Sequence, residues 1–328
     1  MHSRKRSLRK NLPGLALYMG AMILAVAACI LLGEPPGEEA QGSLEGRFES
    51  EIVYPYQGDT LHYRQAALTN LLLLGIDRAD EAGQGALAQE GGQADFLLLV
   101  TADREARQLT LTHIDRDTIA EIGTYGIFGD RAGTVTTQIC LAHAFGPTEE
   151  ARCENTVEAV SRLFGGIPIQ GYIAMDMGEI GVLNQALGGV TVTLDADFSH
   201  LDETMTQGKT ITLTGNQAEL FVRYRNGIAD GSNESRMQRQ RAYLEGCMTI
   251  LESADSAFIK QLLDTMETGI ETNLTESDLM EVWSRWKTYG RETMEPPAGT
   301  HTRDSDGFVA FYPDTDWMAQ YFLTHFFE

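Results

Sequence analysis

Three apolar segments bordered by charged residues constrain the fold of this chain more than any other feature. They are NLLLLGID from Asn70, DFLLLVTAD from Asp95 and QLTLTHIDRDT from Gln108. A short segment that is apolar throughout is typical of a strand buried on both faces of a sheet. Segments with helical spacing alternate with such strands further along the chain. We therefore expect an α/β fold, a three-layer α-β-α sandwich in which helices flank a central mixed sheet.

The remaining pattern predicts the elements around that sheet. Strands are expected at IQGYIAMDM and VTVTLD, with a short one near 52–56, and the segments VAFYPD and DWMAQYFLTHFF close the chain. Gly-Gly pairs end two of the expected helices, which is typical of helix C-termini. The expected helices cover 136–145, 149–164, 178–189, 215–225 and 235–251, and two more lie between 254 and 290.

The N-terminus combines a basic tail with an uncharged apolar segment. Residues 1–11 carry five Lys or Arg and no acid, and 12–32 carry no charge. A segment of this length can cross a bilayer, and preceding positive charge keeps the N-terminus in the cytoplasm. We predict a cytoplasmic tail at 1–11, a single transmembrane anchor at 12–32, a linker at 33–65 and an extracytoplasmic domain at 66–328. The alternative, a lipoprotein cleaved before Cys29, also leaves the domain outside and tied to the membrane.

Charge and cysteine content exclude or disfavour two classes of site. Lys and Arg number 25 against 47 Asp and Glu, a formal net charge of -22, so we expect no nucleic-acid partner. Beyond the anchor, Cys140, Cys153 and Cys247 are odd in number and form no CxxC pair, so we expect no zinc site. Cys140 and Cys153 are either a disulfide or, the interpretation we favour, buried free thiols.

Charged residues gather at the strand ends and in one arginine-rich segment. Asp77 ends the first apolar segment, Asp95 begins the second, and Arg116 follows the third. In a buried sheet the strand ends are the positions that host function. Arginine binds phosphate oxygens bidentately, and residues three and four apart share a helix face. The segment FVRYRNGIADGSNESRMQRQRAYL therefore offers a phosphate site from Arg223, Arg225, Arg236, Arg239 and Gln240.

The motifs NLLLLGID, IDRDT, DMGEIGVLNQALGGVTV and LTGNQAELFVRYRN followed by RMQRQ occur in the order typical of one family. From Asn70 to Leu251 the chain resembles the LytR-CpsA-Psr (LCP) family, also called the cell envelope-related transcriptional attenuator domain. The resemblance implies a phosphotransferase. It would move a glycopolymer, such as wall teichoic acid or capsular polysaccharide, from polyprenyl pyrophosphate to a peptidoglycan sugar hydroxyl and release polyprenyl phosphate.

The resemblance also implies roles for individual residues. Asp77 and Asp95 would bind Mg²⁺, with Mn²⁺ as the alternative, and would be catalytic together with Arg116. The pyrophosphate would be held by Arg116, Arg223, Arg225, Arg236 and Gln240, with Arg239 as a weaker member. We expect such arginines to be unpaired in the empty protein, so that loss of Arg236 would barely change stability.

Several positions depart from the family pattern. Gln93 stands where the family has Arg before its second Asp. In the segment matching KINxAY, Gln138 replaces Lys, Cys140 replaces Asn and His143 replaces Tyr. Asp115 replaces the proline of IPRDT. The missing cations motivate an alternative function, a non-catalytic protein that binds polyprenyl phosphate or cell-wall glycan.

Overall fold

The computed structural model describes residues 52–78, 91–266 and most of 269–328, where gaps fall at 276–277, 280, 283–287, 293, 295, 304 and 306. The expected tail, the anchor and the first part of the linker lie outside the described residues. Within the described ranges, no helix has the length and apolar character needed to cross a bilayer.

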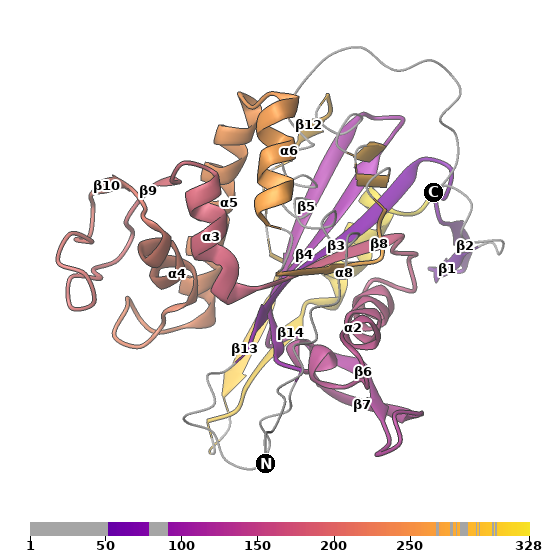
Figure 1. Ribbon diagram of the computed structural model, residues 1–328. Helices are drawn as coiled ribbons and strands as arrows, with labels where there is room; N and C mark the ends of the chain where they lie inside the picture. Colours follow the sequence, from indigo (N-terminus) through magenta and orange to yellow (C-terminus); the bar gives the residue numbers. More distant parts are fainter. Residues whose placement is uncertain are drawn as a thin grey trace, which may run out of the picture.

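A mixed sheet forms the centre of the molecule (Figure 1). Among the described residues, six strands pair in the order β11-β8-β3-β4-β5-β12. Strand β3 pairs antiparallel with β4 and parallel with β8, and β4 pairs antiparallel with β5. This confirms the expected mixed sheet. The strands are β3 (Leu68–Asp77), β4 (Gln93–Asp103), β5 (Gln108–Ile114), β8 (Gly171–Asp176), β11 (Ile270–Thr272) and β12 (Gly290–Arg291).

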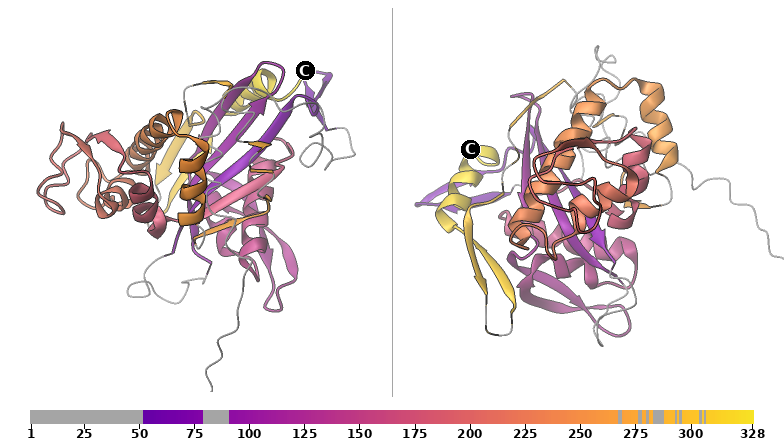
Figure 2. Two further views of the ribbon diagram at one scale, coloured as in Figure 1. Left: turned by 45° about the horizontal axis from the view of Figure 1, so that its top comes forward. Right: turned by 90° about the vertical axis from the view of Figure 1, so that its left-hand side faces the viewer.

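Each face of the sheet packs against helices (Figures 1 and 2). Leu71 and Leu73 belong to one core, and Leu72 and Leu74 to the other, because successive side chains of a strand point to opposite faces. Burying each leucine stabilises the fold by about 1.5–3 kcal/mol. The first core receives α3 (Ile180–Ala186), α4 (Gly215–Arg223), α5 (Asn233–Glu252) and α6 (Ser256–Thr265), and the second receives α2 (Glu149–Leu163) and α8 (Thr315–His325).

The expected helix at 136–145 is wrong. Residues Arg131–Gln138 form β7, which pairs antiparallel with β6 (Ile119–Tyr125), and Ile139–Ala144 form a 3-10 helix, η1. β7 contains the β-branched run Thr134-Val135-Thr136-Thr137, which suits a pleated strand.

The shorter elements are η2 (Met177–Glu179) and the antiparallel pairs β1 (Val53–Tyr56) with β2 (Asp59–His62), β9 (Thr191–Thr193) with β10 (Thr210–Thr212), and β13 (Gly299–Arg303) with β14 (Val309–Pro313).

The second part of the expected linker is folded onto the domain. The backbone of His62 exchanges two hydrogen bonds of 2.9 Å with Glu328, the last residue. Tyr63 is buried, and its ring centre lies 5.8 Å from that of Phe327. The folded domain therefore begins before residue 66.

Candidate functional site

A bulge in the sheet positions the second acidic residue. In the pairing of β3 with β4, Gly75 faces Phe96 and Ile76 faces Ala94, which leaves Asp95 as the extra residue. Bulges of this kind redirect a side chain and occur often beside active sites. The next pair in the ladder is Asp77 with Gln93, so both carboxylates lie at the same end of the sheet.

Asp95 joins two arginines in a buried ion-pair cluster. Its Oδ1 contacts Nη1 of Arg116, and its Oδ2 lies 2.6 Å from Nη1 of Arg236. The side chains of Asp95 and Arg236 are 3% and 2% exposed. Burial raises the pKa of Asp95, but Arg236 and Arg116 outweigh it and hold that pKa below its usual value. The expectation of unpaired arginines is therefore wrong for Arg236, because a buried charge needs a partner.

Asp77 forms a second, more open ion pair. Its Oδ1 lies 2.7 Å from Nη2 of Arg223, at the end of α4, and Arg223 also contacts Glu219. About a quarter of each side chain in the Asp77–Arg223 pair is exposed. Oδ2 of Asp77 has no partner within the described part of the chain. This oxygen is free to bind a cation.

Arg225 is the available cation beside the buried cluster. In the part of the chain that the structure describes, its side chain makes no ion pair or hydrogen bond, and its backbone oxygen accepts from the N–H of Ile228. Its pKa is lowered by removal from water and by the charges of Arg236 and Arg116. Nε of Arg236 is buried without a hydrogen-bond acceptor among the described residues, and Nε of Arg116 is buried with only an ion-pair contact of 3.4 Å to Asp117 Oδ1. An anion placed here would satisfy these donors and relieve the repulsion.

Arg239 and Gln240 are directed toward α4. Nη1 and Nη2 of Arg239 donate to the backbone oxygens of Phe221 at 2.6 Å and Tyr224 at 2.7 Å. Gln240 is buried, and its Nε2 lies 3.4 Å from the backbone oxygen of Val222. The structure thus joins Asp95 with Arg116 and Arg236, and Asp77 with Arg223, whereas Arg239 binds the end of α4.

Polar residues that sequence reasoning did not assign to the site extend the cluster. Gln93 accepts a hydrogen bond of 2.6 Å from Nη2 of Arg116, and Gln138 donates one of 2.8 Å to Asp117. Asn233 accepts from Nη2 of Arg236 at 2.6 Å and donates to Asp115 at 2.8 Å. His301 Nε2 lies 2.8 Å from the other oxygen of Asp115. The spacing of Asn233, three residues before Arg236 on one helix face, is the signal that could have found it.

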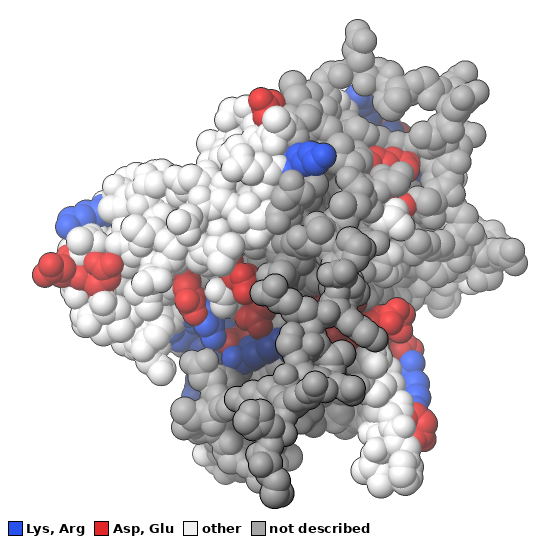
Figure 3. All heavy atoms as spheres, viewed as in Figure 1, with Lys and Arg blue, Asp and Glu red and all other residues white. Residues whose placement is uncertain are grey.

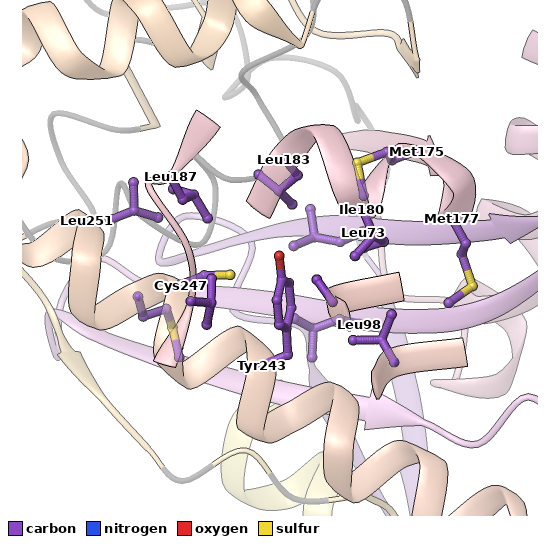
Figure 4. Close-up of a cluster of buried hydrophobic side chains, with 14 of the residues drawn as sticks. Leu73, Leu98, Met175, Met177, Ile180, Leu183, Leu187, Tyr243, Cys247 and Leu251 are labelled. Atoms are coloured by element: carbon purple, nitrogen blue, oxygen red, sulfur yellow. The ribbon is translucent and has the colours of Figure 1, made fainter. Parts of the chain in front are cut away.

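An apolar cavity of about 60 Å³ lies between the sheet and α3, α4 and α5. Figure 4 shows several of its lining side chains, including Met175 from β8, Met177 from η2 and Tyr243 from α5. Gln240 and Val222 also line it, so the cavity adjoins the end of α4 that presents Arg223. Figure 3 shows charges of both signs meeting between α4 and the β13–β14 hairpin. The lining residues are Leu73, Gly75, Phe96, Met175, Met177, Ile180, Leu183, Val222, Gln240, Tyr243, Leu244, Cys247 and Leu251.

Comparison with known proteins identifies relatives of this chain. Two relatives are named polyisoprenyl-teichoic acid–peptidoglycan teichoic acid transferase TagU. The one from Enterococcus faecalis is 25% identical over 287 residues and covers 87% of both chains. The one from Bacillus cereus is 29% identical over 249 residues and covers 75% of this chain and 74% of the relative.

A solved structure shares the fold. The crystal structure of B. subtilis TagV matches with a TM-score of 0.60 at 20% identity, over 79% of this chain and 95% of that chain. The model of the LytR_cpsA_psr family matches residues 46–322, well beyond the motifs between Asn70 and Leu251. The chain therefore belongs to the LytR_cpsA_psr family.

Proposed function

We propose that this protein is a phosphotransferase that moves a glycopolymer from polyprenyl pyrophosphate to a peptidoglycan sugar hydroxyl. The observation that carries the proposal is the cationic cluster of Arg116, Arg225 and Arg236, which keeps unpaired donors beside an apolar cavity. A lipid pyrophosphate has this combination of chemistry, an anionic head on an apolar tail. The relatives' names favour teichoic acid as the polymer, with capsular polysaccharide as the alternative.

The reaction needs charge neutralisation more than covalent help. The sugar hydroxyl attacks the phosphorus that bears the polymer, and a new P–O bond forms. The bond from that phosphorus to the bridging oxygen breaks. Polyprenyl phosphate leaves and takes up the hydroxyl proton. Arg225 and the Nε atom of Arg236, with the charge of Arg116 beside them, would orient the diphosphate and stabilise its growing negative charge.

The apolar cavity would receive the first part of the prenyl tail. At about 60 Å³ it is narrow, so a tail would enter by displacing lining side chains. Met175 and Met177 are unbranched and adapt readily to a ligand.

Membrane attachment suits a donor whose tail stays in the bilayer. We propose the orientation that residues 1–32 indicate: a cytoplasmic N-terminus, one transmembrane segment and an extracytoplasmic domain.

Substituting Arg225 with alanine tests the donor site. We expect the donor to bind more weakly by about 1.5–3 kcal/mol, the range for hydrogen bonds to charged groups. The melting temperature without ligand should stay unchanged or rise slightly, because the substitution removes one positive charge from the neighbourhood of Arg116 and Arg236. The measurement is donor affinity and melting temperature, with Arg131→Ala on the β6–β7 hairpin as the surface control. Undiminished donor affinity in Arg225→Ala would remove this residue from the site.

In the alternative function, the protein binds polyprenyl phosphate or cell-wall glycan but does not transfer a polymer to peptidoglycan. Gln93 and Gln138, which stand where the family has cations, are the observation that favours it. Incubating the protein with a lipid-linked donor and peptidoglycan separates the two functions. Polymer attached to peptidoglycan supports the transferase, and bound donor without product supports the binding protein.

We also propose that Asp77 and Asp95 hold Mg²⁺, or alternatively Mn²⁺, together with the diphosphate. Mg²⁺ sites commonly use one or two carboxylates plus substrate phosphates. The free oxygen of Asp77 fits this role, and Asp95 keeps further lone pairs beside its arginines. When bound, the ion would neutralise charge on the leaving phosphate.

Asp77→Asn should therefore lower transfer strongly and weaken its dependence on Mg²⁺. The fold should lose little, about 1 kcal/mol or less, because the pair with Arg223 is partly exposed and Arg223 keeps Glu219. Transfer rates across a Mg²⁺ titration, beside melting curves, provide the check. A wild-type Mg²⁺ response in the variant would contradict the assignment.

A further inference from the structure

A second cluster of chemically reactive side chains lies on the α2 face of the sheet, apart from the arginines of α5. It contains His143 from η1 and Glu149 and Cys153 from α2. Glu149 and Cys153 are four residues apart and share a helix face. His143 Nε2 lies 3.4 Å from Glu149 Oε1 and 3.7 Å from Cys153 Sγ. One donor atom from each residue lies within 4.8 Å of the others, and both His143 and Cys153 are fully buried.

These spacings fit a tetrahedral ion. Bonds of about 2.0–2.3 Å to nitrogen, oxygen and sulfur place tetrahedral ligands roughly 3.3–3.6 Å apart. The donor atoms of His143, Glu149 and Cys153 would therefore need to move by on the order of 1 Å or less to reach tetrahedral ligand positions around one ion. The other ring nitrogen of His143, Nδ1, lies 2.8 Å from the backbone oxygen of Gly91. Donation to that oxygen leaves Nε2 with its lone pair toward the group, the arrangement that supports histidine ligands in metal sites.

We propose that His143, Glu149 and Cys153 bind one divalent transition-metal ion of the Zn²⁺ class, with water as the fourth ligand. The combination of imidazole, carboxylate and thiolate favours Zn²⁺ over Mg²⁺, because soft sulfur is a poor ligand for Mg²⁺. His143 stands where the family's KINxAY pattern has tyrosine, so the site belongs to this chain rather than to the family pattern. The proposal is independent of the transferase function.

A polar cavity and a supporting shell lie beside Glu149. Glu149 lines a polar cavity of about 330 Å³, which also contains the carboxylates of Asp176, Glu179 and Glu271. Nη2 of Arg78 lies 2.5 Å from Oε1 of Glu149, and Nη1 of Arg152 lies 3.3 Å from Oε2. These two ion pairs hold the carboxylate of Glu149 in place.

The test uses the full chain in detergent, reduced and stripped with a chelator, with Co²⁺ as the spectroscopic probe. We expect one equivalent of Co²⁺ to produce a thiolate-to-cobalt charge-transfer band, and Zn²⁺ to abolish it by displacement. The band should be lost in Cys153→Ser and His143→Ala. It should persist in Cys247→Ser, a matched buried cysteine on α5, and in Asp77→Asn, which tests the proposed Mg²⁺ site.

Glu149→Gln keeps the test decisive if the buried variants fail to fold. Glu149 is partly exposed, and its loss should weaken Co²⁺ binding at least as much as the roughly 10–100-fold typical of losing an outer-shell partner. Absence of the band in wild type, its persistence in a folded Cys153→Ser variant, or unchanged affinity in Glu149→Gln would overturn the proposal.

Discussion

Replacing Asp95 with asparagine is expected to lower the free energy of unfolding by about 3–5 kcal/mol, the range for breaking a buried ion pair, and to abolish transfer. Asparagine has nearly the same shape, so the change isolates the charge. Without it, the guanidinium groups of Arg116 and Arg236 remain buried next to each other. Arg116 keeps Asp117 and Gln93, whereas Arg236 keeps Asn233 alone among its described polar side-chain partners. Chemical denaturation at neutral pH measures the loss.

A second substitution identifies the cause. Asp95→Asn combined with Arg236→Met should recover part of the stability, because the unpaired charge is removed, but should not restore transfer. Asp59→Asn, the same chemical change on an exposed strand, should leave the protein unaffected. Wild-type stability in Asp95→Asn would show that the two arginines do not depend on the carboxylate.

The same ion pair predicts a pH dependence. The folded-state pKa of Asp95 is lower than its unfolded value of about 3.9. Its contribution to stability is therefore complete above about pH 4 and is lost as pH falls through the folded-state pKa. The stability difference between wild type and Asp95→Asn should be constant at neutral pH and shrink in acid.

Replacing Arg239 with alanine is expected to cost about 3–6 kcal/mol of stability, because two charged hydrogen bonds of about 1.5–3 kcal/mol each are lost. Arg239 is 1% exposed and donates to the oxygens of Phe221 and Tyr224, where α4 ends. Its guanidinium also lies 5.3 Å from the ring centre of Phe198. The carbonyl of the buried Phe221 would lose this partner, and an unpaired buried carbonyl is costly.

Burial and the nearby arginines lower the pKa of Arg239 to about 10, so it stays charged at neutral pH. Arg239→Lys should retain part of the stability. Arg239→Ala and Arg225→Ala should show opposite patterns, the first losing stability and the second losing donor affinity. Thermal unfolding with and without donor measures both. If Arg239→Ala lost donor affinity at wild-type stability, Arg239 would be a ligand and not a residue that holds α4.

The sequence by itself determined the sheet and the location of its chemistry. Leu71 to Leu74 are apolar without interruption, and such a strand is stable only when both faces are covered. The acidic strand ends and the arginine segment were visible because they are local features. Their order also indicated the family.

The tertiary structure alone decided which charges pair. Asp95 and Arg236 are 141 positions apart, and a bulge that no sequence period reveals turns Asp95 toward α5. Residues 136–138 became strand because β6 lay beside them, and His143 met Cys153 because η1 packs on α2. Periodicity and capping act over a few residues, whereas ion pairs and metal ligands depend on strand register and packing between distant segments.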